Sequence, residues 1–284
     1  MDLIMVKIAV VTGGAGGMGL AAARVIGRDC AVLICDVDAA RLASAQRDLN
    51  ASGVDCATAT CDITDPASVR QLVEQAQQLG TVMSVVHTAG VSPSMGSAEM
   101  ILRINALGTV LVNEAFLGIA QPGMAVVNVA SVAGHQLPGL AAPTRRYKRA
   151  LQDRDRFYRD LLSSCNRIPR TWQPQIAYVL SKNFVIWYSA AMATRFGEKG
   201  ARVLSVSPGS FDTAMGKLEE GAGAGTLAER SALKRFGQPG EIAELLAFSA
   251  GDKPGYLTGV DIICDGGVTA AMRPLDTVRM ARSR

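Results

Sequence analysis

The glycine-rich stretch near the start of the chain, residues 12–19, constrains the fold more than any other feature. Residues 8–11 are β-formers, five glycines follow between positions 13 and 19, and residues 20–25 are rich in alanine. This order is typical of a strand, a tight turn and a helix. Glycine lets the backbone approach a bound phosphate, and a helix N-terminus directs unpaired N–H groups and a positive dipole end at the same point. The stretch therefore predicts a pocket for an anion, above all for the pyrophosphate of a dinucleotide.

The spacing of these glycines matches two dinucleotide-binding patterns. Gly14, Gly16 and Gly19 meet the general pattern G-x-G-x-x-G. The narrower pattern T-G-x-x-x-G-x-G is met by Thr12, Gly13, Gly17 and Gly19. An ordinary glycine turn beside an acidic helix cap would carry some of the same letters, but the strand before and the helix after favour the nucleotide.

Asp36 ends the next apolar run, residues 31–36, and is expected to select the cofactor. A carboxylate at this position accepts hydrogen bonds from the hydroxyls of the adenosine ribose and repels a 2′-phosphate. The glycine stretch contains no Arg or Lys that could offset this repulsion. The sequence therefore predicts NAD as the cofactor in preference to NADP.

Composition excludes several other classes of protein. The chain has 284 residues, of which 49% are hydrophobic and 19% charged, so it can bury a large core. Its net charge of +4 is too small to indicate a nucleic-acid partner. Two histidines argue against a histidine-based metal site, and six cysteines without C-x-x-C spacing favour reduced thiols. We expect no metal, no membrane-spanning run and no signal peptide before the first strand, and therefore a cytoplasmic protein.

Strands and helices alternate along the chain, which predicts one doubly wound parallel sheet with helices on both faces. We expect a single dinucleotide-binding domain over residues 1–284, with functional groups beyond the carboxyl ends of the strands. The expected strands are 8–11, 31–36, 54–60, 82–87, 124–130, 201–207 and 259–264, and the expected helices are 20–25, 38–49, 65–79, 98–120, 176–198 and 239–250.

Residues 137–173 interrupt this alternation as an insertion. Apolar side chains recur there at helical spacing, beside nine Arg or Lys and three Asp residues. One interpretation is an added amphipathic helix with a solvated basic face, and the other is a lid that attracts an anionic substrate. The arginine-rich tail, about residues 272–284, is expected to be solvated or to close with its first residues over a partner subunit.

Tyr178 and Lys182 lie four residues apart in a predicted helix, so both side chains emerge on one face. An ordinary tyrosine, with a pKa of about 10, is a poor base at neutral pH. A nearby ammonium group and a nicotinamide cation would both favour the phenolate and lower this pKa. Such a tyrosine can take a proton from an alcohol or return one to a ketone. A solvated helix pair is the alternative for this spacing alone.

Together these residues resemble the short-chain dehydrogenase/reductase family over nearly the whole chain. Four residues in order match the family's catalytic tetrad: Asn105, Ser131, Tyr178 and Lys182. The cofactor contacts that the resemblance implies are Gly13, Gly17, Met18, Gly19, Asp36, Asp62, Ile63, Ala89, Gly90, Tyr178, Lys182, Pro208, Gly209, Phe211 and Thr213.

The resemblance also implies roles for the tetrad. Tyr178 would be the acid/base, and Ser131 would hydrogen-bond the reacting oxygen. Lys182 would bind the nicotinamide ribose and lower the tyrosine pKa, while Asn105 would hold a water in the proton relay. The expected activity is the NAD-dependent interconversion of a secondary alcohol and a ketone.

Three departures from the family pattern resemble the 3α-hydroxysteroid dehydrogenase/carbonyl reductase branch: the short segment 90–105, the long gap 131–178 and the unusual ending 265–274. They imply a hydrophobic substrate, steroid-like or smaller. His135 is as readily a plain loop residue as a pocket residue, and His87, in place of a family asparagine, is expected to be packed at a strand end. The expected substrate contacts are Ser131, His135, Tyr178, Phe211 and Met215.

Family members pair through their last helix and strand, and many pair again through the helices that carry Asn105 and Tyr178. Because the insertion precedes the second of these helices, we expect a homodimer through residues 239–265 rather than a tetramer. Two other functions stay open. Asp36 argues against a 3-oxoacyl thioester reductase, since those enzymes generally prefer NADPH. The complete tetrad argues against a catalytically silent NAD-binding sensor or scaffold.

Overall fold

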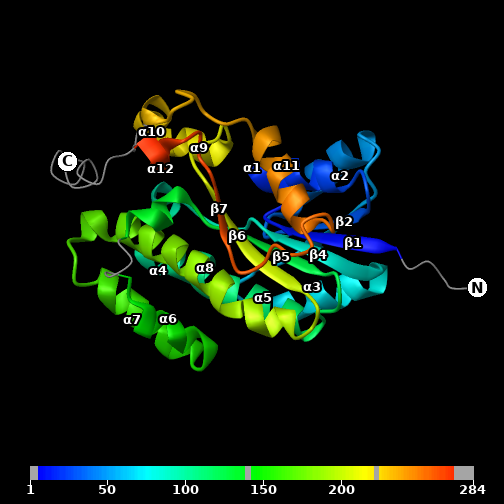
Figure 1. Cartoon of the computed structure of the whole chain (residues 1–284), viewed down its shortest axis with the longest axis horizontal. Helices are drawn as coiled ribbons and strands as arrows, with labels where there is room; N and C mark the ends of the chain where they lie inside the picture. The colour runs from blue at the N-terminus through cyan, green and yellow to red at the C-terminus, as the bar shows by residue number, and fades with distance from the viewer. Residues whose placement is uncertain (1–5, 138–141, 221–223, 272–284) are drawn as a thin grey trace, which may run out of the picture.

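Seven parallel strands form one sheet in the computed structural model, which describes residues 6–137, 142–220 and 224–271. The strand order is β3-β2-β1-β4-β5-β6-β7 (Figure 1). The winding direction reverses between β1 and β4, which confirms the predicted doubly wound fold. The strands are β1 (Lys7–Thr12), β2 (Ala31–Asp36), β3 (Cys56–Thr60), β4 (Thr81–His87), β5 (Ala125–Val129), β6 (Arg202–Pro208) and β7 (Asp261–Cys264).

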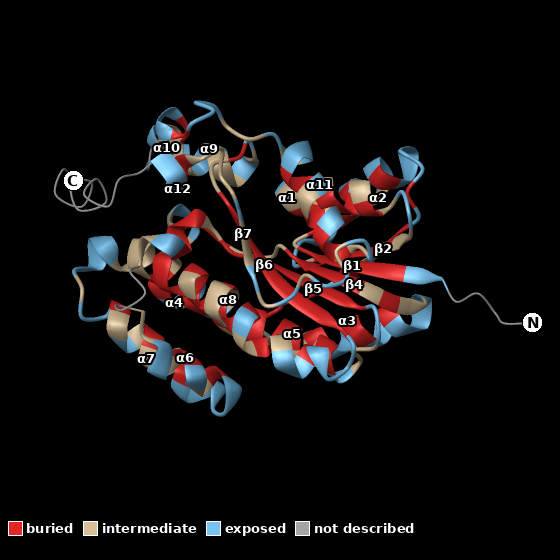
Figure 2. Ribbon diagram, viewed as in Figure 1, coloured by how far each residue is buried: buried red, intermediate tan, exposed pale blue. Residues whose placement is uncertain are grey.

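Helices cover both faces of the sheet, with one hydrophobic core on each side (Figure 2). Successive side chains of a strand point to opposite faces. In β1, Val10 therefore joins the core under α3, α5 and α8, while Val11 joins the core under α1, α2 and α11. The main helices are α1 (Gly17–Ile26), α2 (Ala39–Ala51), α3 (Pro66–Leu79), α4 (Ala98–Leu102), α5 (Thr109–Gly118), α8 (Gln173–Gly197) and α11 (Pro239–Ala250).

Two helices begin near their predicted positions because an aspartate caps each N-terminus. The Asp38 carboxylate accepts hydrogen bonds from the backbone N–H groups of Ala40 and Arg41 at 2.9 and 3.0 Å and so caps α2. Asp65 caps α3 in the same way. Strand β2 and helix α11 have the predicted bounds, and the other predicted strands lie within a few residues of their observed positions.

The predicted helix 98–120 is observed in three pieces. A π-helical turn, η2 (Arg103–Gly108), separates α4 from α5 and contains Asn105. The same stretch corrects the expectation that no apolar run reaches membrane-spanning length. Ala98–Gly118 has 21 residues and a mean hydropathy of 1.4, but 67% of its apolar window is buried within the protein. Such burial is typical of the core helix of a globular fold.

The insertion forms two helices rather than one. They are α6 (Thr144–Tyr147) with the 3₁₀ turn η5 (Lys148–Leu151), and α7 (Arg154–Cys165), followed by the 3₁₀ turn η6 (Arg170–Trp172). The buried Tyr147 hydroxyl donates a hydrogen bond to Asn183 Oδ1 on α8 at 2.9 Å, and Phe157 and Leu161 are fully buried. This apolar face against the domain supports the interpretation as an added amphipathic helix.

Two further sequence expectations concern the cysteines and the tail. All six cysteines are free thiols, and four of them are buried, as predicted. Within the described ranges, no group of three His, Cys, Asp or Glu side chains is arranged to hold a metal ion. The tail 272–284 and residues 138–141 of the insertion lie outside the described residues.

Candidate active site

The glycine loop lies against the end of β4, where several of its positions leave no room for a side chain. Gly13 has φ +65°, and a Cβ there would stand 2.8 Å from the backbone of Ala89. A Cβ on Gly19 would stand 2.4 Å from the Gly13 carbonyl oxygen and 2.5 Å from Thr88 Oγ1. The loop and the N-terminus of α1 therefore fit a bound pyrophosphate, which requires this close backbone approach.

A buried chain of hydrogen bonds joins this loop to η2. His87 is bonded through Nδ1 to the Thr12 hydroxyl at 2.7 Å and through Nε2 to the Thr109 hydroxyl at 3.1 Å. Because Thr109 donates its own proton to the Asn105 carbonyl at 2.8 Å, Nε2 must carry the ring proton. Burial, and then the charge of Lys182, lowers the pKa of His87 to about 3, so the ring stays neutral. The predicted packed role of His87 is confirmed.

Thr88 makes a second connection between β4 and the loop. Its hydroxyl donates to the Thr12 carbonyl at 2.6 Å, and Thr12 Oγ1 accepts from the Ala89 N–H at 3.3 Å. His87 and Thr88 therefore both hold the strand end against the cofactor loop.

Ser131 and Tyr178 are brought together by the end of β5 and by α8. Ser131 follows β5 and caps the 3₁₀ turn η3 (Val132–Gln136), where its hydroxyl accepts from the Ala133 N–H at 3.2 Å. The turn packs so closely on α8 that a Cβ on Gly134 would stand 2.8 Å from the Asn183 backbone nitrogen. In this arrangement the Ser131 hydroxyl lies close enough to Tyr178 to lower the pKa of the tyrosine.

The electrostatic environment of Tyr178 differs from the sequence expectation. Burial raises the pKa of Tyr178, the nearby Ser131 hydroxyl lowers it, and the Glu219 carboxylate raises it. Lys182 is not among the groups that shift this pKa; its ammonium group lies 5.9 Å from the ring centroid and donates to the Val129 carbonyl at 2.9 Å. Burial also lowers the pKa of Lys182 to about 8. The positive charge of an oxidised nicotinamide ring would favour the phenolate here.

The Asn105 side chain fixes the backbone segment that follows β4. Its Oδ1 accepts from the Val91 N–H and its Nδ2 donates to the Val91 carbonyl, both at 2.9 Å. A Cβ on Gly90 would stand 3.1 Å from Asn105 Oδ1 and 3.6 Å from Lys182 Nζ. Gly90, Asn105 and Lys182 therefore converge at the end of β4, whereas the water-holding role of Asn105 stays a prediction.

The predicted adenosine contacts lie at the ends of β2 and β3. These ends are neighbours, because the Cys61 N–H donates to the Asp36 carbonyl at 2.9 Å. Asp62 Oδ1 accepts from the backbone N–H and the hydroxyl of Thr64, both at 2.8 Å. The side chain of Ile63 is only 6% exposed and belongs to the core, so its cofactor contact can come only from its backbone.

The segment that follows β6 contacts β7 at one residue and the cofactor loop at another. Gly209 approaches β7 so closely that a Cβ would stand 2.8 Å from Asp265 Cα. Thr213 caps α9 (Ala214–Glu219), and its Cβ lies 4.0 Å from a Cβ built on Gly17, so it faces the cofactor loop, while its contact with the cofactor stays a prediction. Met215 follows in α9 and is half-buried.

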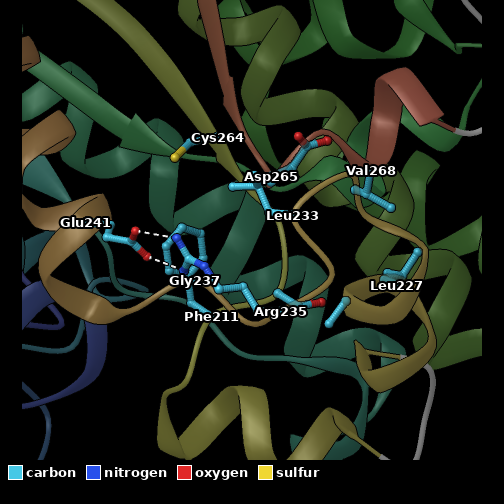
Figure 3. Close-up of a pocket in the computed structure, with 12 residues that line it drawn as sticks. Phe211, Leu227, Leu233, Arg235, Gly237, Glu241, Cys264, Asp265 and Val268 are labelled. Carbon is cyan, nitrogen blue, oxygen red and sulfur yellow. Dashed lines mark hydrogen bonds and ion pairs between the residues drawn. The ribbon is translucent and has the colours of Figure 1, made fainter.

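Phe211 does not face Tyr178, which corrects its assignment as a substrate contact. Its ring lies beneath Gly237, where a Cβ would stand 2.4 Å from Phe211 Cε1, and it belongs to the core on the α1 and α11 side of the sheet. It lines a cavity of about 100 Å³ between α10 (Gly225–Arg230), α12 (Val268–Ala271) and the Arg235–Glu241 ion pair (Figure 3). The sequence could not show which side of the segment this ring would occupy.

His135 also differs from its predicted place in the substrate pocket. Its Nε2 lies 2.9 Å from Asp261 Oδ2 and 3.3 Å from the Ser207 hydroxyl. Asp261 also accepts a hydrogen bond from the Ser205 hydroxyl at 2.6 Å. The ring therefore links η3 to the edge strand β7 instead of lining the site beside Tyr178.

Two charged residues near the site were missed by the sequence analysis. Glu219 Oε1 accepts a hydrogen bond from the Ser94 N–H at 3.0 Å and joins α9 to the 3₁₀ turn η1 (Pro93–Met95). The Arg41 guanidinium group lies beside Gly16 in the cofactor loop. Both contacts join residues far apart in sequence, and neither residue belongs to a recognisable local motif.

Comparisons with known proteins agree with this arrangement. Residues 7–143 match a family model described as short chain dehydrogenase, and residues 161–269 match one described as enoyl-(acyl carrier protein) reductase. A short-chain dehydrogenase/reductase of Alternaria brassicicola, bsc3, is 33% identical over 264 residues, which cover 90% of this chain and 94% of that protein. An acetoacetyl-CoA reductase of Allochromatium vinosum is 26% identical over 278 residues, covering 93% of this chain and 99% of that protein.

A solved structure supports the fold independently. A short chain dehydrogenase from Burkholderia cenocepacia in complex with NADP has a TM-score of 0.73 at 24% identity and covers 93% of this chain and 98% of its own. With the matched segments, the Alternaria relative and the geometry of the site, the chain belongs to the short-chain dehydrogenase/reductase family of oxidoreductases.

Proposed function

We propose that this protein interconverts a secondary alcohol and a ketone with NAD as the cofactor and Tyr178 as the acid/base. The observation that carries the proposal is the convergence of Ser131 on Tyr178, one helical turn from Lys182, at the strand ends of a dinucleotide-binding sheet. The bound nicotinamide ring would supply the chemistry of hydride transfer.

The protein's own side chains transfer the hydroxyl proton of the alcohol and bind the reacting oxygen. In oxidation, Tyr178 as phenolate accepts the hydroxyl proton of the alcohol while the carbon loses its hydride; in reduction, the phenol returns that proton to the carbonyl oxygen. Ser131 donates a hydrogen bond to the same oxygen and stabilises the charge that develops on it. Lys182 lies close enough to Gly90 and Asn105 to hold the nicotinamide ribose at the end of β4.

Asp36 supports NAD as the preferred cofactor. Its position at the end of β2, half-buried, suits a carboxylate that accepts hydrogen bonds from two ribose hydroxyls. A 2′-phosphate in the same place would meet a like charge. Asp36→Asn is therefore expected to reduce the preference for NAD over NADP.

A hydrophobic substrate, steroid-like or smaller, is suggested by η1 and α9, two neighbouring segments that expose large apolar side chains. Met95 in η1 is 42% exposed and Leu218 in α9 is 60% exposed, although both are large apolar side chains. The contact between Ser94 and Glu219 holds these segments together. Apolar groups on two facing segments favour an apolar alcohol or ketone over a small polar polyol.

A 3-oxoacyl thioester reductase is the second candidate, and the likeness to an acetoacetyl-CoA reductase supports it. The chemistry at the carbonyl would be the same, so the substrate and the cofactor distinguish the two. We expect faster turnover with apolar ketones and NADH than with an acetoacetyl thioester and NADPH.

We also propose a cytoplasmic homodimer through α11 and β7. This surface exposes Phe248 at 49%, Val260 at 41% and Ile263 at 41%, which is apolar area that a second copy would bury. The insertion packs against α8 and η2, the elements of the alternative pairing surface that carry Tyr178 and Asn105. Sedimentation velocity is expected to give a dimer, and a stable tetramer would contradict the proposal.

The test is absorbance at the reduced-nicotinamide band, with NAD and NADP in parallel, over steroid, aliphatic and aromatic alcohols and ketones and an acetoacetyl thioester. Tyr178→Phe is expected to lower kcat by about 10²–10⁴-fold, the usual range for general acid–base catalysis, without weakening NAD binding. Tight NAD binding without turnover of any substrate would instead favour a catalytically silent sensor.

A further inference from the structure

The positive charge of the protein is concentrated in the insertion. Residues 144–172 contain nine Arg or Lys and three Asp side chains, a net charge of +6, whereas the whole chain has a net charge of +4. The remainder of the chain therefore has a net charge of −2. Eight of the nine cations are arginines, whose guanidinium groups form paired hydrogen bonds with phosphate oxygens.

Most of these cations have no acidic partner among the described residues. Arg149 is paired with Asp160, and Arg154 lies 3.4 Å from Glu114 on α5. The other unpaired cations are exposed and take part in none of the ion pairs within residues 6–137, 142–220 and 224–271: Arg145, Lys148, Arg156, Arg159, Arg167 and Arg170.

Helix α7 directs its unpaired cations away from the protein. Phe157, Leu161 and Cys165 recur every four residues, are fully buried and belong to the core shared with α4 and α8. Arg156 and Arg159 lie on the opposite face of the helix, since each residue turns by about 100°. Helices α6 and α7 form the outermost layer on this side of the sheet, so the cationic face is turned to solvent (Figure 1).

Two large apolar side chains are exposed within the same segment. Leu151 ends η5 and is 37% exposed, and Trp172 ends η6 and is 39% exposed. An indole ring, with an apolar body and one N–H donor, suits the boundary between lipid headgroups and acyl chains. The apolar face of α7 is already buried in the protein, so any contact with lipid uses the cations and these two side chains.

We propose that α6, α7 and η6 form a docking surface for a bilayer that contains anionic phospholipids. The cations bind the phosphate groups of the lipid headgroups, and Leu151 and Trp172 contact the boundary with the acyl chains. Each basic residue near an anionic membrane surface raises the binding constant by about fivefold. Several unpaired cations therefore suffice for reversible binding without a lipid anchor or a spanning helix.

An acidic protein or a nucleic acid would be attracted by the same charges, but two observations favour the bilayer. Leu151 precedes α7 and Trp172 follows its end, so an apolar contact lies on each side of the cations, which suits an extended lipid surface. An apolar substrate would also be concentrated in the bilayer. This second argument rests on the proposed function, whereas the first depends only on the surface.

The experiment sediments the full-length protein with vesicles, without cofactor or substrate. Phosphatidylcholine vesicles with about one third phosphatidylglycerol are expected to bind the protein at low ionic strength and to release it in about 0.5 M salt, which screens charges. Vesicles of phosphatidylcholine alone should bind little. The fluorescence emission of Trp172 should shift to shorter wavelength on binding, and Trp172→Phe should remove this shift.

Arg156→Gln combined with Arg159→Gln removes two cations from the outer face of α7. It is expected to weaken vesicle binding by about 25-fold, at fivefold for each charge. Arg24→Gln combined with Arg47→Gln is the matched control, because both residues are exposed, lie on α1 and α2 across the sheet and belong to none of the ion pairs in the described part of the chain. It lowers the net charge equally and should leave binding nearly unchanged.

Equal weakening in the two double variants, or none in either, would overturn the proposal, because net charge or the arginine-rich tail would then account for binding. Absence of sedimentation with the anionic vesicles at low ionic strength would overturn it as well. Tighter binding of an acidic peptide or a double-stranded RNA than of the vesicles would assign the surface to that partner instead. Turnover of a water-soluble ketone without vesicles tests the proposed function separately, and both double variants should retain it.

Discussion

The floor and the roof of the active site are built in different ways. The floor consists of the ends of β1, β4 and β5 with α8, and its functional side chains His87, Asn105 and Lys182 are 2%, 1% and 7% exposed. The roof consists of η1 and α9, where Met95 and Leu218 are 42% and 60% exposed. Backbone contacts and buried hydrogen bonds fix the floor, while one hydrogen bond between Ser94 and Glu219 joins η1 to α9.

This difference separates the reaction from the choice of substrate. A change in the floor must move close-packed backbone or leave a buried polar group without its partner, and both are strongly unfavourable. A substituted side chain in the roof is partly exposed to solvent, so the substitution leaves the sheet intact. We therefore expect substitutions in the floor to alter catalysis or stability by large factors and substitutions in the roof to alter specificity by small ones.

Gly19→Ala tests the floor at its tightest point and has the largest expected effect. The new Cβ would stand 2.4 Å from the Gly13 carbonyl oxygen, so the loop must shift by a large fraction of an ångström. Such a displacement lowers kcat/KM by about 100-fold. Steady-state kinetics and the dissociation constant of NAD measure it.

Gly240→Ala is the control for this prediction. A Cβ on Gly240 meets no atom within 4 Å, and alanine in a helix is more stable than glycine by about 0.5–1 kcal/mol. It is expected to leave the kinetics unchanged. If Gly19→Ala behaved like Gly240→Ala, the close packing of the floor would not matter for function.

Lys182→Met tests the electrostatics of the floor through the pH dependence of stability. The folded protein releases the Lys182 proton near pH 8, whereas the unfolded chain holds it to a pKa near 10.5. Between these values the unfolded state binds more protons, so the free energy of unfolding of the wild type rises with pH. The wild type should gain on the order of 1–3 kcal/mol relative to the variant across this window. Urea unfolding at pH 7.5 and pH 9.5 measures the difference, and parallel pH profiles would contradict it.

The floor was largely predictable from the sequence, because each of its parts carries a local signal. The glycine loop, the acid at a strand end and the Tyr–Lys pair are each recognised from residues that lie close together in the sequence. The π-helical turn at Asn105 was not predictable, since it forms where the side chain bonds Val91 across the site. The contacts of His135 with Asp261 and of Glu219 with Ser94 are also tertiary, and they span 126 and 125 residues.

His87→Phe tests whether the buried hydrogen bonds of the floor stabilise it. A planar aromatic ring is kept, although it is one atom larger, but the bonds to the hydroxyls of Thr12 and Thr109 are lost, which costs about 1–3 kcal/mol at pH 7. Folded His87 has a pKa of about 3 and unfolded His87 a pKa near 6.5, so below pH 6.5 the unfolded state binds more protons. The wild type therefore loses stability relative to the variant as the pH falls from 6.5 toward 3. Thermal unfolding at pH 7 and pH 5 measures the gap, which should narrow; a constant gap would show that the ring is charged or solvated.

Glu219→Gln tests the roof and has the smallest expected effect. Glutamine can still accept the hydrogen bond from Ser94, but it lacks the charge that raises the pKa of Tyr178. Removing this charge lowers the tyrosine pKa, so the pH at which alcohol oxidation reaches half its maximum should move to lower pH. An exposed charged contact is worth about 0–1 kcal/mol, so KM should change by no more than about fivefold.

Glu220→Gln separates the charge of Glu219 from a general change in the roof. Glu220 follows Glu219, is exposed and does not appear among the groups that shift the pKa of Tyr178. It should leave the pH profile of kcat unchanged. If both variants moved the profile equally, the roof would act only through its overall charge. If Glu219→Gln instead abolished turnover, the roof would take part in the chemistry, and the separation between a catalytic floor and a selective roof would fail.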